Sequence, residues 1–181
     1  MIPMTSSAFL HRRALLLGVA SAALTAACSA GGSGGAAAGS SSGPASGVEA
    51  AFASDPVRKI TDAEWKQKLP ELSYQVLRHE ATERPGTSPL LDEHRTGQFV
   101  CLGCELPLFE SKWKFESGTG WPSFYDRIKE NIAQKVDADG QRTEYHCARC
   151  IGHQGHVFDD GPPPTGLRYC NNGAAIKFVP A

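Results

Sequence analysis

The chain has 181 residues, enough for one folded domain of about 100–150 residues and additional terminal segments. Its 18 basic and 19 acidic residues give a formal net charge of −1. This near balance excludes the strongly basic surface with which nucleic-acid-binding domains neutralise phosphates, so we expect no nucleic-acid partner.

The N-terminal stretch has the features of an export signal. Arg12 and Arg13 precede an apolar run over residues 14–27, which is shorter than the roughly 20 apolar residues that span a bilayer. The paired arginines and the Ala-Ala-Cys sequence at 26–28 predict a twin-arginine, lipoprotein-like signal at residues 1–27, with lipid on Cys28. We therefore expect an exported protein, anchored in the membrane through Cys28 and facing the periplasm or the cell exterior. Plain secretion and an uncleaved tether are the alternatives.

The next stretch separates this signal from the folded domain. Residues 28–57 are rich in Gly, Ala and Ser, a composition that predicts a flexible tether, and the domain is expected over 58–181. Thr61 and Glu64 form the sequence pattern of a capping box, which predicts a helix start there. Pro70 ends that helix, and a second short helix is expected over 71–80.

From residue 98 onward the pattern changes to short β-type runs separated by turns. Asp139 and Gly140 tolerate positive φ and predict a hairpin turn between two of the runs. The fold class is therefore mainly antiparallel β with short N-terminal helices. The expected strands are 98–102, 112–116, 131–136, 142–147, 156–158, 167–170 and 174–179.

Two CxxC units supply four cysteines, Cys101, Cys104, Cys147 and Cys150. Four thiolates can close a tetrahedral shell around one Zn²⁺, and each CxxC lets two sulfurs on one tight turn converge on the metal. We expect one structural, closed zinc site formed by two separate hairpins. The alternatives are two redox-active CxxC pairs or two disulfides.

Cys170 is the one cysteine of the predicted domain that lacks a CxxC partner, and it is our candidate nucleophile. Arg168 lies two residues away, on the same face of a strand, where its cation would favour the reactive thiolate. His153 and His156 flank Gly155, and either imidazole could carry a catalytic proton near pH 7. The alternative interpretation is a buried structural thiol with satisfied core or surface histidines.

The stretch 117–124, SGTGWPSF, holds two aromatic residues beside glycines and a proline. Trp121 is a candidate substrate-binding residue, since an indole ring attracts a methyl group next to sulfur. Phe124 is a second candidate for substrate binding, although a plain core position is favoured for it.

The ordered motifs CxxC, GTGWPSF, CxxC, GHQGHVFDDGPPPTGLRYCNN and AIKFVP resemble those of the peptide methionine-R-sulfoxide reductases of the B type, over residues 61–180. The resemblance implies a β-sandwich of two antiparallel sheets, described as tent-like, with the zinc remote from the active site. It also implies an enzyme that reduces the R epimer of methionine sulfoxide within oxidised proteins.

The resemblance also implies roles for individual residues. Cys170 would attack the sulfoxide sulfur and become a sulfenic acid, while His153 or His156 delivers a proton to the oxygen. Trp121 would hold the substrate's methyl group. The polar residues that shape the pocket would be Asp160, Arg168 and Asn172.

The chain departs from its relatives where many of them carry a resolving cysteine, since Thr119 occupies that position. We therefore expect a cycle with a single catalytic cysteine, in which an external thiol attacks sulfenylated Cys170. That reductant would be an exported thioredoxin-like or glutaredoxin-like protein, or a small thiol. Gln154 and Gly173 replace residues that are commonly hydrophobic and serine, respectively.

A second class of function is a non-catalytic, zinc-stabilised β domain that binds a small ligand or peptide. Such a domain has no use for a lone thiol beside Arg168 and two nearby histidines. The joint presence of Cys170, His153, His156 and Asn172 therefore favours the enzyme.

Overall fold

The computed structural model describes residues 47–138 and 140–181. The expected signal at 1–27 and the lipid site at Cys28 lie outside these residues, as does Asp139 of the expected hairpin turn. None of the helices within the described ranges is long and apolar enough to cross a membrane.

The helices precede the strands, as the sequence predicts. The capping box is present: the Glu64 main-chain N–H donates to the Thr61 hydroxyl, and the Thr61 main-chain N–H donates to the Glu64 carboxylate. The second predicted helix is also present and ends at a left-handed Glu80. The helical elements of this part are α1 (Gly47–Ala50), η1 (Pro56–Lys59), α2 (Asp62–Lys68), α3 (Glu71–His79) and η2 (Pro89–Asp92).

The described part of the expected tether is not featureless. Residues 47–57 include α1 and the start of η1, and they make polar contacts with the segment 146–149. The charged side chains at Glu49 and Asp55 provide these contacts, and they interrupt the Gly/Ala/Ser composition on which the prediction depended.

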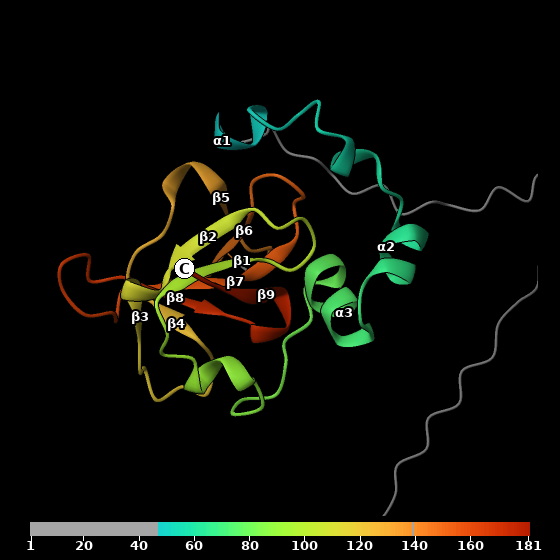
Figure 1. Cartoon of the computed structure of the whole chain (residues 1–181). Coiled ribbons are helices and arrows are strands. Elements are labelled where there is room, and N and C mark those ends of the chain that lie inside the picture. Colours follow the sequence, from blue (N-terminus) through green and yellow to red (C-terminus); the bar gives the residue numbers. More distant parts are fainter. Residues whose placement is uncertain (1–46, 139) are drawn as a thin grey trace, which may run out of the picture. The chain divides into compact units, whose positions relative to one another are not determined.

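In residues 47–138 and 140–181, nine strands form two antiparallel sheets (Figure 1). One sheet has the order β2-β1-β9 and the other β3-β4-β8-β7-β6-β5. The fold-class prediction is therefore confirmed. The strands are β1 (Gly97–Cys101), β2 (Pro107–Glu110), β3 (Lys114–Phe115), β4 (Ser123–Phe124), β5 (Ile132–Val136), β6 (Thr143–Cys147), β7 (His153–Phe158), β8 (Arg168–Asn171) and β9 (Ile176–Pro180); the short helices η3 (Ser111–Trp113), η4 (Lys129–Asn131) and η5 (Gly173–Ala175) lie between them.

Two strands were not predicted, and three predictions have other bounds. The expected strand 112–116 is too long, 156–158 covers only the second half of β7, and 174–179 begins inside η5. β2 begins at a proline, and β4 has only two residues, so neither gives an alternating pattern. In the expected strand 112–116, the first two residues lie in the 3-10 turn η3, and only Lys114 and Phe115 pair with β4.

Aromatic side chains from both sheets fill the core. The rings of Phe109 on β2 and Phe124 on β4 stack with centroids 4.1 Å apart, and Phe99 on β1 meets Phe124 edge-on at 4.9 Å. Tyr145 and Tyr169 continue the cluster on the larger sheet, with centroids 5.3 Å apart. Aromatic pairs at these separations stabilise the fold by more than their buried area alone would give. The cluster therefore holds the two sheets together.

Candidate active site and metal centre

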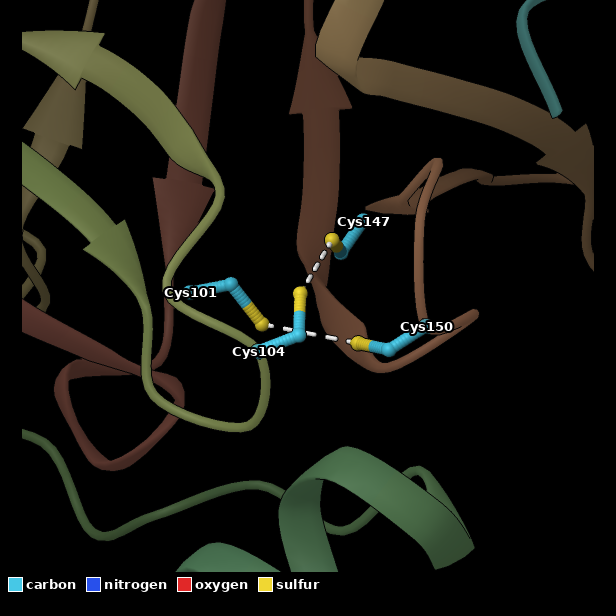
Figure 2. A group of neighbouring side chains, drawn as sticks. All are labelled: Cys101, Cys104, Cys147 and Cys150. Carbon is cyan, nitrogen blue, oxygen red and sulfur yellow. Dashed lines mark hydrogen bonds between the residues drawn. The ribbon is translucent and has the colours of Figure 1, made fainter. Parts of the chain in front are cut away.

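Four cysteines from the two CxxC units converge in one cluster (Figure 2). Their sulfur atoms all lie within 4.8 Å of one another. The close pairs run between the two units, Cys101 with Cys150 at 3.6 Å and Cys104 with Cys147 at 3.5 Å. Zinc–sulfur bonds of about 2.3 Å place tetrahedral ligands about 3.8 Å apart, so this donor set fits a metal ion.

The two cysteine turns share one backbone geometry. The N–H of Glu105 donates to the Cys101 carbonyl at 2.8 Å, and the N–H of Ile151 donates to the Cys147 carbonyl at 2.9 Å. Glu105 and Ile151 both have positive φ, of 62° and 59°. No disulfide joins the five described cysteines, and matching turns of this kind favour metal ligation over separate redox pairs.

The N-terminal segment packs against the second cysteine turn. The Arg58 guanidinium donates to the main-chain carbonyls of Ala148 at 2.6 Å and Arg149 at 2.5 Å. Arg149 in turn pairs with Asp55 at 2.8 Å and donates to the Cys104 carbonyl at 3.2 Å. These contacts fix both cysteine turns from outside the cluster.

Cys170 opens into a small pocket of about 160 Å³ on the other side of β8 from the core. The pairing of β7 with β8 sets His156 directly opposite Cys170. Gly155 is required by this pairing, because a Cβ there would lie 1.9 Å from the Cys170 carbonyl oxygen. The lining residues are Thr82, Trp121, Arg142, Gly155, His156, Phe158, Cys170, Asn171 and Asn172.

Opposing influences act on the Cys170 thiol. Burial is the largest influence and leaves the pKa of Cys170 above its ordinary value, while the Arg168 guanidinium and the Thr119 hydroxyl act to lower it. Arg168 is held in place by two hydrogen bonds of 2.8 Å to the Asp160 carboxylate and by the ring of Phe158, 4.4 Å from the guanidinium carbon. The cation that favours the thiolate is therefore fixed rather than free to swing into solvent.

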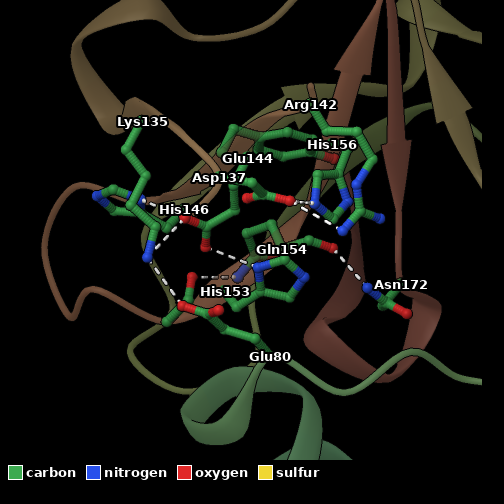
Figure 3. Close-up of polar contacts among 12 residues, drawn as sticks. Glu80, Lys135, Asp137, Arg142, Glu144, His146, His153, Gln154, His156 and Asn172 are labelled. Carbon is green, nitrogen blue, oxygen red and sulfur yellow. Dashed lines mark hydrogen bonds and ion pairs between the residues drawn. The ribbon is translucent and has the colours of Figure 1, made fainter. Parts of the chain in front are cut away.

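His153 is buried in a polar network (Figure 3). Its Nδ1 is 2.7 Å from Glu144, which also pairs with Lys135 at 3.0 Å. Burial alone would raise the pKa of Glu144, but hydrogen bonds from His146, His153 and Lys135 lower it overall. Glu144 is therefore ionised and fixes the orientation of the His153 ring.

His156 is the imidazole that lines the pocket. Its Nε2 is 2.9 Å from the Asp137 carboxylate, which also accepts from Arg142 at 2.9 Å (Figure 3). The His153 and His156 rings meet edge-on with centroids 5.5 Å apart. The two predicted histidines are thus neighbours, each oriented by its own carboxylate.

The structure sorts the predicted site residues into four groups. Cys170, His156, Trp121 and Asn172 line the pocket, while His153, Arg168 and Asp160 adjoin it without lining it. The four CxxC cysteines form the separate metal cluster. Phe124 is fully buried and stacks on Phe109, so it belongs to the core and not to the pocket wall as a substrate contact.

Sequence reasoning missed the partners of these residues, notably Asp137, Arg142 and Glu144. One signal was available: residues 142, 144 and 146 alternate along a predicted strand and so share one face. Which residues these side chains meet could not be predicted, because that depends on the register between β6 and β7.

The SelR domain family matches residues 69–180. The chain belongs to the SelR family of MsrB-type methionine sulfoxide reductases. The SelR match begins beyond α1, η1 and α2, so the segment that packs on the metal cluster lies outside it.

Three relatives illustrate the similarity, each named peptide methionine sulfoxide reductase MsrB. The protein of Thiobacillus denitrificans is 48% identical over 123 residues, which are 66% of this chain and 93% of the relative. That of Herminiimonas arsenicoxydans is 50% identical over 65% of this chain and 88% of its own length. That of Leptospira interrogans is 47% identical over 65% and 92%. Among solved structures, the yippee-like domain of Mis18 aligns with 48% of this chain and 98% of that domain, at a TM-score of 0.36 and 16% identity.

The electrostatics of Cys170 can be tested by replacing Arg168 with Met, which keeps the bulk and removes the charge. Loss of the cation should move the pKa of Cys170 further upward, because the guanidinium charge stabilises the thiolate. The measurement is the pH dependence of Cys170 alkylation by iodoacetamide, followed by peptide mass spectrometry. Arg95→Met, at an exposed arginine paired with Glu93, is the matched control and should leave the midpoint unchanged. An unshifted midpoint in Arg168→Met would contradict the assigned role.

Proposed function

We propose that this chain reduces methionine-R-sulfoxide in proteins to methionine, with Cys170 as the nucleophile. The observation that carries the proposal is a half-buried thiol in a small pocket, with Trp121 on the wall and His156 directly across the strand pair. The activity named for the relatives supports it. A pocket of about 160 Å³ suits one thioether side chain better than a large ligand.

The proposed chemistry balances with one proton and one thiolate. The Cys170 thiolate attacks the sulfoxide sulfur, and an imidazolium of His153 or His156 protonates the sulfoxide oxygen. The oxygen passes to Cys170 as a sulfenic acid, and the reduced thioether leaves as methionine. His156 is the better situated acid of the two, because it lines the pocket opposite Cys170.

Trp121 and the fixed Arg168 complete the proposed site. The indole ring offers an apolar surface to the substrate's methyl group, which leaves the sulfoxide oxygen free to face the imidazole. Arg168 stabilises the thiolate before attack, and Asp160 and Asn172 keep the polar side of the pocket in position.

Regeneration requires thiols from outside the described residues. Thr119 stands where many relatives carry a resolving cysteine, and its hydroxyl bonds Ser117 at 2.8 Å. The other described cysteines are gathered in the metal cluster. A first external thiol would condense with the sulfenic acid and release water, and a second would free Cys170 from the mixed disulfide. An exported thioredoxin-like or glutaredoxin-like protein, or a small thiol, fits this role.

The proposal extends to a structural zinc ion and to export. Cys101, Cys104, Cys147 and Cys150 would hold Zn²⁺, which would supply folding free energy and take no part in the reduction. The paired arginines, the apolar run 14–27 and Cys28 support an exported, lipid-anchored enzyme.

The central prediction concerns stereospecific turnover by the full-length protein with dithiothreitol. The wild type should reduce methionine-R-sulfoxide and leave the S epimer, and Cys170→Ser should lower the rate on the order of a thousandfold or more, since the nucleophile is lost. Cys28→Ser changes the cysteine expected to carry lipid and should be as active as the wild type. Equal activity of Cys170→Ser and wild type would refute the mechanism.

The single-cysteine cycle predicts a trappable intermediate. One equivalent of substrate without reductant should leave a sulfenic acid on Cys170, detected by mass spectrometry as a dimedone adduct. The matched control is Thr119→Cys, in which a neighbouring thiol should replace the adduct with an intramolecular disulfide. A disulfide between Cys170 and any other cysteine of the unsubstituted chain would rule the cycle out.

The metal centre predicts about one tightly bound zinc ion per chain by elemental analysis. Cys104→Ser should reduce the zinc content and lower the unfolding temperature, because a three-thiolate site binds the ion less tightly. Thr165→Ala, at an exposed hydroxyl that bonds the Tyr125 carbonyl and neither cysteine turn, is the control and should retain the metal. Full stability of the metal-free protein would contradict a structural role.

A further inference from the structure

Glu83 is a buried acidic residue to which the reaction described above assigns no role. It lies between α3 and η2, and only 4% of its surface is exposed. Its carboxylate accepts two main-chain hydrogen bonds, from the N–H of Gly173 at 2.5 Å and from the N–H of Ala174 at 2.9 Å. Burial raises the pKa of Glu83, and these two hydrogen bonds oppose the shift.

The two N–H groups belong to the first turn of η5, where main-chain donors have no partner within the helix. Asn172, the residue that precedes η5, provides no side-chain cap. Glu83 therefore caps η5 from a distant segment of the chain. Because η5 follows β8 almost directly, this cap also fixes the end of the strand that carries Cys170.

The main chain of Glu83 holds two walls of the pocket. Its N–H donates to Oδ1 of Asn172 at 3.0 Å, and its carbonyl accepts from the indole Nε1 of Trp121 at 3.1 Å. Asn172 and Trp121 both line the pocket, and so does the neighbouring Thr82. Glu83 thus contacts the Trp121 ring, the Asn172 side-chain amide and the turn that follows β8, the strand that carries Cys170.

The fit around the carboxylate is tight. A Cβ at Gly173 would lie 1.9 Å from the Ser88 hydroxyl oxygen and 3.2 Å from Oε1 of Glu83. A side chain at position 173 would therefore displace Ser88 and crowd Glu83. This accounts for the glycine at position 173 of this chain.

We propose that Glu83 is a positioning residue for sulfoxide reduction, which sets the place of Trp121 and Asn172 relative to Cys170. This inference rests on the proposed function, because it needs the substrate's methyl group to lie on Trp121 while its sulfur meets Cys170. The reacting atoms must approach to about 3–3.5 Å, and a displacement of about 1 Å can cost a hundredfold in rate. Glu83 itself touches neither the thiol nor the substrate.

The test compares Glu83→Ala and Glu83→Gln with the wild type in the full-length protein. Single-turnover reduction of methionine-R-sulfoxide should slow about tenfold or more in Glu83→Ala. Glu83→Gln keeps one acceptor oxygen and should lie between that variant and the wild type. Alkylation of Cys170 by iodoacetamide should keep its wild-type rate in both, because Arg168 and Thr119 act on the sulfur and Glu83 does not.

Two further measurements separate positioning from general stability. Glu64→Ala removes the capping-box carboxylate of α2, away from the pocket lining, and should lower stability without slowing turnover. The indole N–H resonance of Trp121, assigned with Trp121→Phe, should move in the Glu83 variants and stay in place in Glu64→Ala.

Unchanged turnover in folded Glu83→Ala would overturn the inference, and so would an equal loss of turnover and of Cys170 alkylation. If the alanine variant does not fold, the same two outcomes in Glu83→Gln decide the question. Failure of the proposed function gives a different result, since Cys170→Ser would then retain activity. If Cys170→Ser does retain activity, an unmoved Trp121 resonance in the Glu83 variants would still count against the positioning role of Glu83.

Discussion

The antiparallel pairing of β7 with β8 is the constraint on which the site depends. It sets His156 opposite Cys170 and Phe158 opposite Arg168, so one register determines both the neighbour of the thiol and the support of its cation. The pairing tolerates no side chain at Gly155, since a Cβ would overlap the Cys170 carbonyl. A shift of one residue would turn every one of these side chains to the opposite face of the sheet.

Around this strand pair, each charged group of the site has a fixed partner. Carboxylates orient the two imidazoles and the guanidinium: Asp137 holds His156, Glu144 holds His153, and Asp160 holds Arg168. Such groups lose little conformational entropy when a substrate binds, because they already hold their positions, and the site is preorganised in this sense. Arg168 and Thr119 oppose the effect of burial on Cys170, but burial is the larger effect and leaves the pKa of the thiol above its ordinary value.

Stability and chemistry depend on different parts of the fold. The cysteine cluster joins the end of β1 in the smaller sheet to the end of β6 in the larger one, and the stacked rings of Phe109 and Phe124 join the sheets again through the core. The pocket uses side chains of the larger sheet and of the loops around it. Substitution in the pocket can therefore change the chemistry while the two connections between the sheets remain.

The sequence by itself determined those features that are local or that recur as ordered motifs. The capping box at Thr61 predicted α2, the two CxxC units predicted the metal ligands, and the motif around Cys170 identified the family. Tertiary structure alone decided which side chains meet. β4 is too short to show a pattern, and the pairing of Glu144 with His153 or of Glu83 with the N–H groups of η5 depends on strand register and chain crossing. Hydrogen bonds between segments far apart in the chain leave no periodic trace in a single sequence, so the contacts of Glu83 with Trp121 and with η5 can be found only in the folded molecule.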